Sequence, residues 1–206
     1  MPQDGSGPSP GQIMTFAEGD PDENPWVAGG PMVETIAVLP HQPVWAEVYD
    51  RCAAAIRAAL PGGMVSIDHV GSTAVPGLAA KPVIDIDLIV PDPEAEADYV
   101  PPLAGLGYRL TVRERSWYGH RLLRLERPRV NLHVFGPDCP EHSRHLMFRD
   151  WLRARPDERE RYGAIKAEAQ VGAQTAMAYN RRKEAVVREI YARMFRDLGW
   201  LRDPAE

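Results

Sequence analysis

The sequence contains little cysteine and no long hydrophobic run. Among its 206 residues there are two cysteines, Cys52 and Cys139, and their number and separation exclude a disulfide framework or a zinc knuckle. The longest apolar stretch, residues 83–90, is interrupted by two aspartates, and the first residues lack the basic start and apolar run of a signal peptide. We therefore expect a protein of the reducing cytoplasm that neither spans nor enters a membrane.

Positive charge is absent from the first part of the chain. Residues 1–50 contain eight acidic residues and no Lys or Arg, whereas the remainder has 24 Lys and Arg against 21 Asp and Glu, a net charge of +3. Residues 142–202 hold fourteen basic residues against eight acidic ones, a local excess of six. This excess suits a polyanionic small substrate and is too modest to require nucleic acid, so we do not expect a nucleic-acid partner.

The sequence also lacks an internal repeat, and its composition predicts one domain preceded by an arm. Residues 1–33 are rich in Pro, Gly, Asp and Glu with little periodicity, which predicts a disordered or loosely packed N-terminal arm. Residues 34–200 are enough for a single domain with its own core. Within that domain we expect a sheet part over about 34–140 and a helical part over about 141–200.

The hydrophobic pattern is mixed at first and becomes helical toward the C-terminus. Short β-branched or alternating segments predict strands at 65–70, 82–90, 108–113, 121–126 and 130–135. Helical spacing predicts helices at 42–60, 143–154, 156–171 and 175–198, and a further helix at 94–106 that is broken or restarted at Pro101-Pro102. This order predicts an α/β (α+β) fold, in which helices flank a small mixed sheet and form the C-terminal half.

Two aspartates on one strand are the strongest indication of chemistry. Asp85 and Asp87 alternate along the predicted strand, so their side chains share a face, roughly 6–7 Å apart at the backbone. A Gly71-Ser72 turn lies upstream, and no Gly-Lys-Ser/Thr follows it, which excludes a P-loop. We expect the two carboxylates to form a solvent-facing metal clamp; the alternative is an exposed strand edge whose acids pair with Arg or Lys.

With these residues in view, the chain resembles the GrpB family of the nucleotidyltransferase superfamily. The run His69-Val-Gly-Ser-Thr-Ala-Val-Pro-Gly-Leu-Ala-Ala-Lys-Pro-Val-Ile-Asp-Ile-Asp87 is similar to the family signature, and residues 148–153, FRDWLR, are similar to a segment of its C-terminal helices. The resemblance covers about residues 35–198. It implies a nucleotidyltransferase-like sheet, a Gly71-Ser72 pair that holds nucleotide phosphate, and Mg²⁺ or Mn²⁺ bound by Asp85 and Asp87.

Several basic and hydroxyl side chains are further candidates for phosphate binding. The family match extends to Tyr162 and Lys166 and to Tyr179 and Lys183, and Arg149 lies in the matched helical segment. We expect Arg149, Lys166, Tyr179 and Lys183 to converge on a phosphate or carboxylate, against the alternative of a solvated helix face with ion pairs. Lys81 lies near enough to contact phosphate, although it also suits a strand-entry position.

Four histidines leave alternatives open. His69 precedes the turn and suits a structural role, and His142 and His145 are three residues apart without a convincing third zinc ligand. His133 and Asn131 share one face of the predicted strand 130–135, where related nucleotidyltransferases carry a third carboxylate. His133 is therefore our candidate for a general base near neutral pH or a metal ligand.

The site residues predict a transferase. We expect a metal-dependent enzyme that transfers a nucleotidyl or phosphoryl group to a small-molecule acceptor, with an NTP as donor, Asp85, Asp87 and His133 as catalytic residues, and Glu126 as another possible acid. The alternatives are a noncatalytic nucleotide- or metabolite-binding regulatory module, as family members fused to dephospho-coenzyme A kinase suggest, or a ligase-like biosynthetic enzyme.

Overall fold

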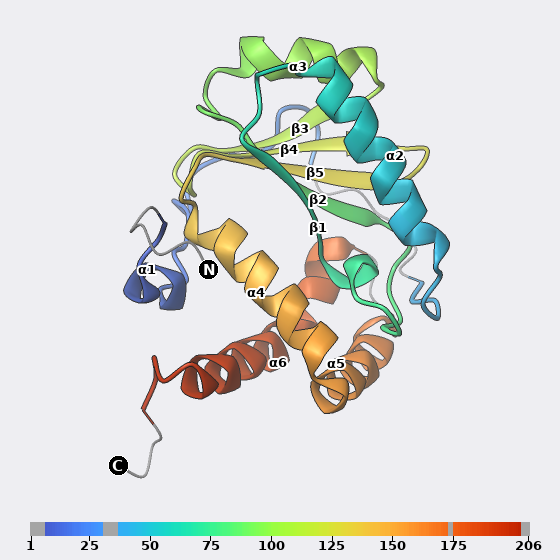
Figure 1. Cartoon of the computed structure of the whole chain (residues 1–206), viewed down its shortest axis with the longest axis vertical. Coiled ribbons are helices and arrows are strands. Elements are labelled where there is room, and N and C mark those ends of the chain that lie inside the picture. The colour runs from blue at the N-terminus through green and yellow to red at the C-terminus, as the bar shows by residue number, and fades with distance from the viewer. Residues whose placement is uncertain (1–6, 31–36, 173–174, 203–206) are drawn as a thin grey trace.

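A five-stranded mixed sheet forms the centre of the computed structural model, which describes residues 7–30, 37–172 and 175–202 (Figure 1). The strands are β1 (Ser66–Val70), β2 (Ile84–Ile89), β3 (Arg109–Glu114), β4 (His120–Leu125) and β5 (Val130–Phe135). Their order is β1-β2-β5-β4-β3, with β2 and β5 parallel and every other neighbouring pair antiparallel. All five correspond to strands predicted from the sequence.

The helices confirm the predicted α+β fold. Those described are α1 (Pro10–Met14), α2 (Val44–Ala59), α3 (Glu96–Gly105), α4 (Pro140–Ala154), α5 (Pro156–Ala169) and α6 (Ala176–Asp197), with the single turn η1 (Ser72–Ala74) before β2. The predicted break at Pro101-Pro102 is wrong, because α3 continues through both prolines. Burial of Tyr99 and Leu103, on either side of the pair, offsets the hydrogen bonds that the prolines remove.

One face of the sheet is apolar and lies under α2 and α3. On β2 the side chains of Ile84, Ile86 and Leu88 are each at most 3% exposed and belong to the main core cluster, as the predicted alternation requires. Helices α2 and α3 cover this face in Figure 1. The core thus fixes which way β2 faces, and the aspartates between these residues must point to the other side.

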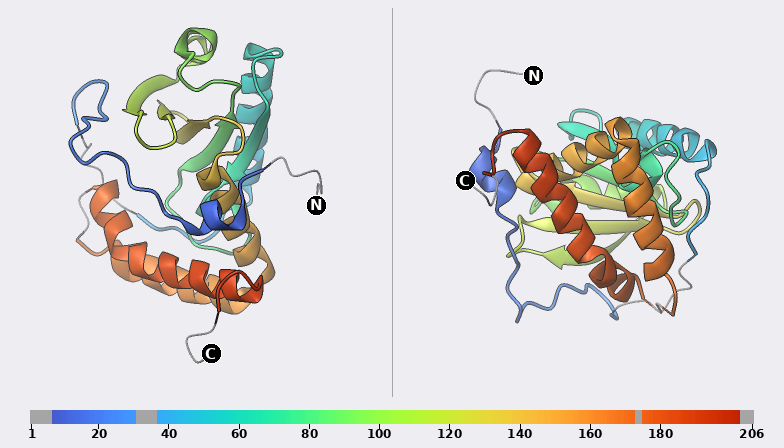
Figure 2. Two further views of the ribbon diagram at one scale, coloured as in Figure 1. Left: turned by 90° about the vertical axis from the view of Figure 1, so that its left-hand side faces the viewer. Right: turned by 90° about the horizontal axis from the view of Figure 1, so that it is seen from below.

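The opposite face carries the polar residues and lies under the C-terminal helices. Seen from below, α4, α5 and α6 lie across this face, and the N-terminal segment runs along one side of it (Figure 2). Residues opposite each other in neighbouring strands share a face, so the register forms rows across the sheet. One row contains Asp85, Asn131 and Arg124, and the next contains Asp87 and His133.

The described part of the N-terminal arm, residues 7–30, is held by a buried arginine. Arg144 of α4 is fully buried, and its Nη1 donates to the carbonyls of Ile13 at 2.7 Å and Thr15 at 3.0 Å. Its guanidinium also bonds Glu141 and lies 5.0 Å from the ring centroid of Phe16. This packing is tighter than the loosely packed arm that composition predicts; residues 1–6 and 31–33 lie outside the described residues.

No helix in the described ranges combines the length and apolar character needed to cross a bilayer.

Replacing Arg144 with Met should destabilise the protein strongly. The substitution leaves Glu141 and the α1 carbonyls without their buried donor, and breaking a buried ion pair typically costs about 3–5 kcal/mol. Urea denaturation measures this difference. Arg109→Met is the matched control, because Arg109 pairs with Glu126 at the surface and its loss should cost at most about 1 kcal/mol. Equal losses for the two variants would contradict the role given to Arg144.

Candidate functional site

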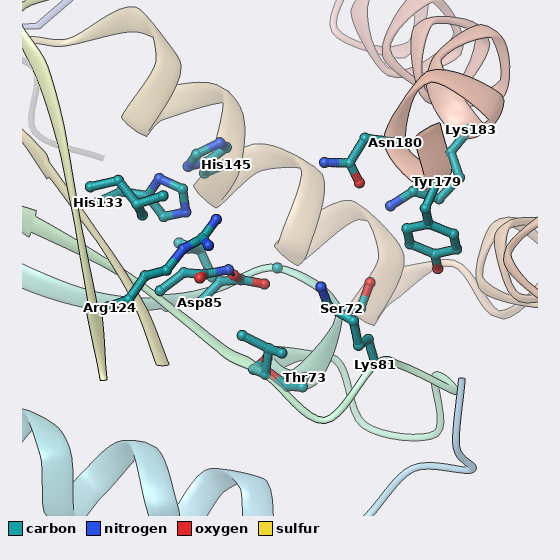
Figure 3. Close-up of a pocket in the computed structure, with 15 residues that line it drawn as sticks. Ser72, Thr73, Lys81, Asp85, Arg124, His133, His145, Tyr179, Asn180 and Lys183 are labelled. Carbon is teal, nitrogen blue, oxygen red and sulfur yellow. Dashed lines mark hydrogen bonds between the residues drawn. The ribbon is translucent and has the colours of Figure 1, made fainter. Parts of the chain in front are cut away.

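A cavity of about 330 Å³ lies between the polar face of the sheet, the Gly71–Thr73 turn and α6. We call it the anion cleft. Figure 3 shows Asp85, Arg124 and His133 on the sheet side, Ser72, Thr73 and Lys81 at one end, and Tyr179, Asn180 and Lys183 reaching in from α6. Asn131 and His145 complete its polar lining. Five of the sequence-predicted phosphate-binding residues therefore meet in one place: Gly71, Ser72, Lys81, Tyr179 and Lys183.

Asp85 is the acidic residue of the anion cleft. Asn131 donates its amide to Asp85 Oδ1 at 2.9 Å, and the backbone of Gly71 approaches the other side of the carboxylate. A Cβ at position 71 would lie 2.5 Å from Asp85 Oδ2, and φ is +69° there, so both space and backbone conformation require glycine. Burial raises the pKa of Asp85 above its ordinary value, although Asn131 and Lys81 oppose the rise.

Asp87 is in a different environment, because two histidines of α4 bind it. Its side chain is fully buried, and its Oδ2 accepts from Nδ1 of His142 and from Nδ1 of His145, each at 2.9 Å. Burial alone would raise the pKa of Asp87, but the two histidines outweigh it and hold the pKa well below its usual value. Asp87 and Glu141 in turn raise the pKa of His145 well above normal against the effect of burial, so His145 is an imidazolium.

This arrangement corrects the expectation of two solvent-facing acids. Asp85 opens to the anion cleft, whereas Asp87 lies beneath His142 and His145, which are the basic partners that relieve repulsion between the acids. Among the described residues there is no group of three or more His, Cys, Asp or Glu that could hold a metal ion. As arranged, the pair does not fit a shared Mg²⁺ or Mn²⁺, although Asp85 alone fits as one oxygen ligand.

His133 lines the cleft beside Asp85, as predicted, but it does not titrate near neutral pH. Burial and the neighbouring His120 lower the pKa of His133 to about 3, so its imidazole is neutral in ordinary buffers. Glu114 binds Nδ1 of His120 at 2.6 Å, and Nε2 of His120 lies 3.0 Å from Nδ1 of His133. Nδ1 of His133 therefore belongs to this chain of hydrogen bonds, and its Nε2 is the ring nitrogen left for a ligand.

Lys81, Lys183 and Arg124 give the cleft its positive charge. All three line it, and Nζ of Lys183 lies 4.3 Å from the ring centroid of Tyr179, a cation–π contact that holds the ammonium at the cleft wall. Arg124 was missed by sequence reasoning, as were Asn180 and His145. The register places Arg124 directly opposite Asn131, but the pairing of β4 with β5 has no signature in the sequence that distinguishes it from other pairings.

Two predicted phosphate ligands do not reach the anion cleft. Arg149 donates to the backbone carbonyl of His69 at 3.0 Å and pairs with Asp150. Lys166 is 1% exposed, and its Nζ donates to the carbonyl of Ala79. Both side chains face the part of the chain that forms the sheet. There they donate to backbone carbonyls before and after the Gly71 turn, and these bonds support the conformation of the turn. The predicted convergence of all four helical residues is therefore wrong for these two.

Glu126, the other possible acid, is also outside the cleft. It lies beyond the end of β4, and its carboxylate pairs with Arg109 at 2.9 Å, with both side chains more than half exposed. His69 has the structural role that its position suggests, because its Nε2 lies 3.1 Å from the Thr73 hydroxyl and its ring stacks on Tyr49.

Lys166 gives stability a pH dependence that a methionine would remove. Burial lowers the pKa of Lys166 to about 6, whereas the unfolded chain keeps it near 10.5. Between these values the unfolded state binds the extra proton, so this group's contribution to the unfolding free energy rises with pH. The difference in unfolding free energy between wild type and Lys166→Met should shift by about 2 kcal/mol in favour of wild type from pH 6 to pH 8.

Urea denaturation at several pH values measures that difference. Arg161→Met is the control, since Arg161 is an exposed cation of the same helix and its difference from wild type should stay constant. A constant difference for Lys166→Met would mean that the Ala79 carbonyl and the Tyr162 ring, 4.7 Å from Nζ, keep the ammonium charged despite burial.

Comparison with known proteins identifies relatives over most of the chain. A UPF0157 protein of Halalkalibacterium halodurans is 42% identical over 160 residues, which cover 77% of this chain and 82% of that protein. A protein named dephospho-CoA kinase from Mycolicibacterium paratuberculosis is 32% identical over 186 residues, covering 77% of this chain and 46% of that longer protein.

A solved structure and a family model agree with these matches. The crystal structure of the conserved protein GrpB from Enterococcus faecalis is similar with a TM-score of 0.68 and 29% identity, covering 79% of this chain and 99% of that chain. The family model described as GrpB protein matches residues 35–193, which include the whole sheet and nearly all of the anion cleft's helical wall. The chain belongs to the GrpB family.

Proposed function

We propose that the anion cleft binds a nucleoside triphosphate and that the protein transfers a nucleotidyl or phosphoryl group from it to a small molecule. The observation that carries the proposal is the convergence of a glycine turn, a hydroxyl and several cations around one carboxylate. Gly71 and Ser72 form one wall, Lys81 approaches from the loop before β2 and Lys183 from α6, and Asp85 lies among them. Backbone amides, hydroxyls and ammonium groups are the donors that bind phosphate oxygens.

The cations of the cleft favour an anionic ligand, and the buried Asp85 carboxylate favours a cation or a proton beside that ligand. Asp85 has a raised pKa, so its carboxylate is destabilised by burial and would gain from a positive partner. A triphosphate accompanied by Mg²⁺ or Mn²⁺ meets both needs, since such ions bind one or two carboxylates together with phosphate oxygens. Asp85 would hold the ion, which when bound neutralises charge on the transferred phosphate. Asp87 fits this role only if His142 and His145 release it.

The residues around the phosphates would act by position. Lys81, Lys183 and Arg124 would fix the triphosphate against the Gly71 turn, and neutral His133 would form a hydrogen bond to the ligand through Nε2. Such placement of donors accounts for much of the acceleration in phosphoryl transfer. With a pKa of about 3, His133 is a weak base, so we assign it to orienting the ligand.

A noncatalytic binding module is the second candidate, and the burial of Asp87 favours it. Because histidines bind Asp87, the two aspartates cannot hold a metal ion together as arranged, but the anion cleft is still present. This chain corresponds to 46% of the relative named dephospho-CoA kinase, which is consistent with a module that binds a nucleotide or coenzyme precursor beside another activity. Both candidates suit the reducing cytoplasm, since Cys52 and Cys139 are free thiols.

Calorimetric titration of ATP with Mg²⁺ should show saturable binding that Lys183→Ala weakens. Removing an ammonium that contacts phosphate typically costs about 1.5–3 kcal/mol, so we expect a Kd about 10- to 100-fold higher. Lys81→Ala should act in the same direction. Arg109→Ala, which removes a cation from the far edge strand, should bind as wild type does.

An assay of product release distinguishes the two candidate functions. A transferase should release pyrophosphate or ADP from ATP when a mixture of small alcohols, amines and phosphorylated metabolites is supplied, and Asp85→Asn should abolish that release. Saturable ATP or dephospho-coenzyme A binding without product would support the binding module. If neither ligand binds, or if Lys183→Ala and Arg109→Ala bind alike, the anion cleft has been misassigned.

A further inference from the structure

A second, larger cavity opens on the other side of the Gly71-Ser72 turn. Its volume is about 690 Å³, within the range of small-molecule sites. Aromatic side chains from five separate parts of the chain line it: Phe16, Trp117, Phe148, Tyr162 and Tyr191. We call it the aromatic cavity. None of the functions considered so far uses these aromatic residues.

The aromatic cavity and the anion cleft share a wall. Gly71 and Ser72 line both cavities, and so do His145, Asn180 and Lys183. Asn180 and Lys183 extend from α6 toward the turn (Figure 3). Ligands bound in the two cavities would therefore meet at these five residues, which form part of the polar lining of the aromatic cavity.

The aromatic walls are fixed by contacts among themselves. Phe148 packs against Tyr162 and Tyr191 with ring centroids 5.4 and 5.1 Å apart, and Phe16 packs edge-on against Tyr191 at 5.2 Å. The Tyr191 hydroxyl donates to the carbonyl of Arg144 at 3.1 Å, which anchors its ring. Rings held in this way form a preformed apolar surface, so a flat ligand would not have to order them.

Charges occur at the polar end and the rim, and two acids there already have basic partners. Glu141 bonds Arg144 and His145, and Glu184 bonds Arg188 at 3.4 Å. The Arg188 guanidinium also lies 3.8 Å from the ring centroid of Phe16. The cavity thus offers apolar surface over its body and hydrogen-bonding groups at the shared wall.

We propose that the aromatic cavity binds a second small molecule, with a flat apolar body against the aromatic walls and a polar group directed at Ser72, Asn180 and Lys183. This molecule lies beside the ligand of the anion cleft. Its identification as the acceptor of the transferred group rests on the proposed function, whereas its binding does not. The sheet half supplies the turn, α4 to α6 supply most of the wall, and the N-terminal segment closes one side through Phe16.

Calorimetric titration with 2-naphthol tests the proposal, because this probe combines a flat ring system with one hydroxyl. Wild type should bind it saturably. Phe16→Ala should raise the Kd about fivefold, as expected for loss of one aromatic contact. Val187→Trp and Met177→Trp, which place an indole in the cavity from α6, should abolish binding. Met177 is 53% exposed, so its replacement leaves the core intact. Trp26→Ala, in the same N-terminal segment but outside the cavity, is the control.

ATP titrated into the same variants keeps the two proposals apart. Suppose that 2-naphthol binds wild type but not Val187→Trp, while ATP does not bind wild type. The proposed site in the aromatic cavity is then supported, and the proposal that the anion cleft binds a nucleotide fails. Binding of 2-naphthol that Met177→Trp and Val187→Trp leave unchanged would overturn the inference, as would the absence of saturable binding to wild type. Equal weakening by Trp26→Ala and Phe16→Ala would also overturn it.

Discussion

The buried carboxylate of Asp87 connects the two halves of this protein. It projects from strand β2, and its partners His142 and His145 lie on α4, so one cluster links the sheet to the helical layer. A buried carboxylate without partners is costly, because its charge loses hydration. The bonds to Asp87 therefore help to fix α4 on the polar face of the sheet. From α6, in the same helical layer, Lys183 and Tyr179 reach the anion cleft.

The same connection gives different surroundings to two aspartates that look equivalent in the sequence. Asp85 and Asp87 share a face of β2, yet their surroundings move their pKa values in opposite directions. Asp85 meets an amide and a glycine backbone at the anion cleft, whereas Asp87 is bound by an imidazolium. Opposed pKa values in neighbouring acids often accompany different roles. Here Asp87 links the sheet to α4, and Asp85 is the acid that faces the cleft.

The sequence predicted the sheet well because alternation is a local property. Ile84, Ile86 and Leu88 indicate the buried face of β2 without knowledge of its neighbours, and Asn131 and His133 follow by the same reasoning. The partners of Asp87 are not local: His142 and His145 lie more than fifty residues away, and their spacing suggests a metal pair as readily as an ion pair. Lys166 shows the same difficulty. The sequence predicts that it lies on a helix, but it does not predict the bond to the Ala79 carbonyl. Pairings across the two halves therefore required the structure.

Basic side chains of the helical layer also hydrogen-bond the turn that borders both cavities. Arg149 donates to the carbonyl of His69, Arg153 to that of Ala74 at 2.8 Å, and Lys166 to that of Ala79. These three bonds hold the segment before, within and after the Gly71-Ser72 turn. Because the turn has few regular backbone hydrogen bonds of its own, its geometry depends on helices α4 and α5. Arg149 and Lys166, which the sequence predicted to bind phosphate, thus support the backbone that lines the anion cleft.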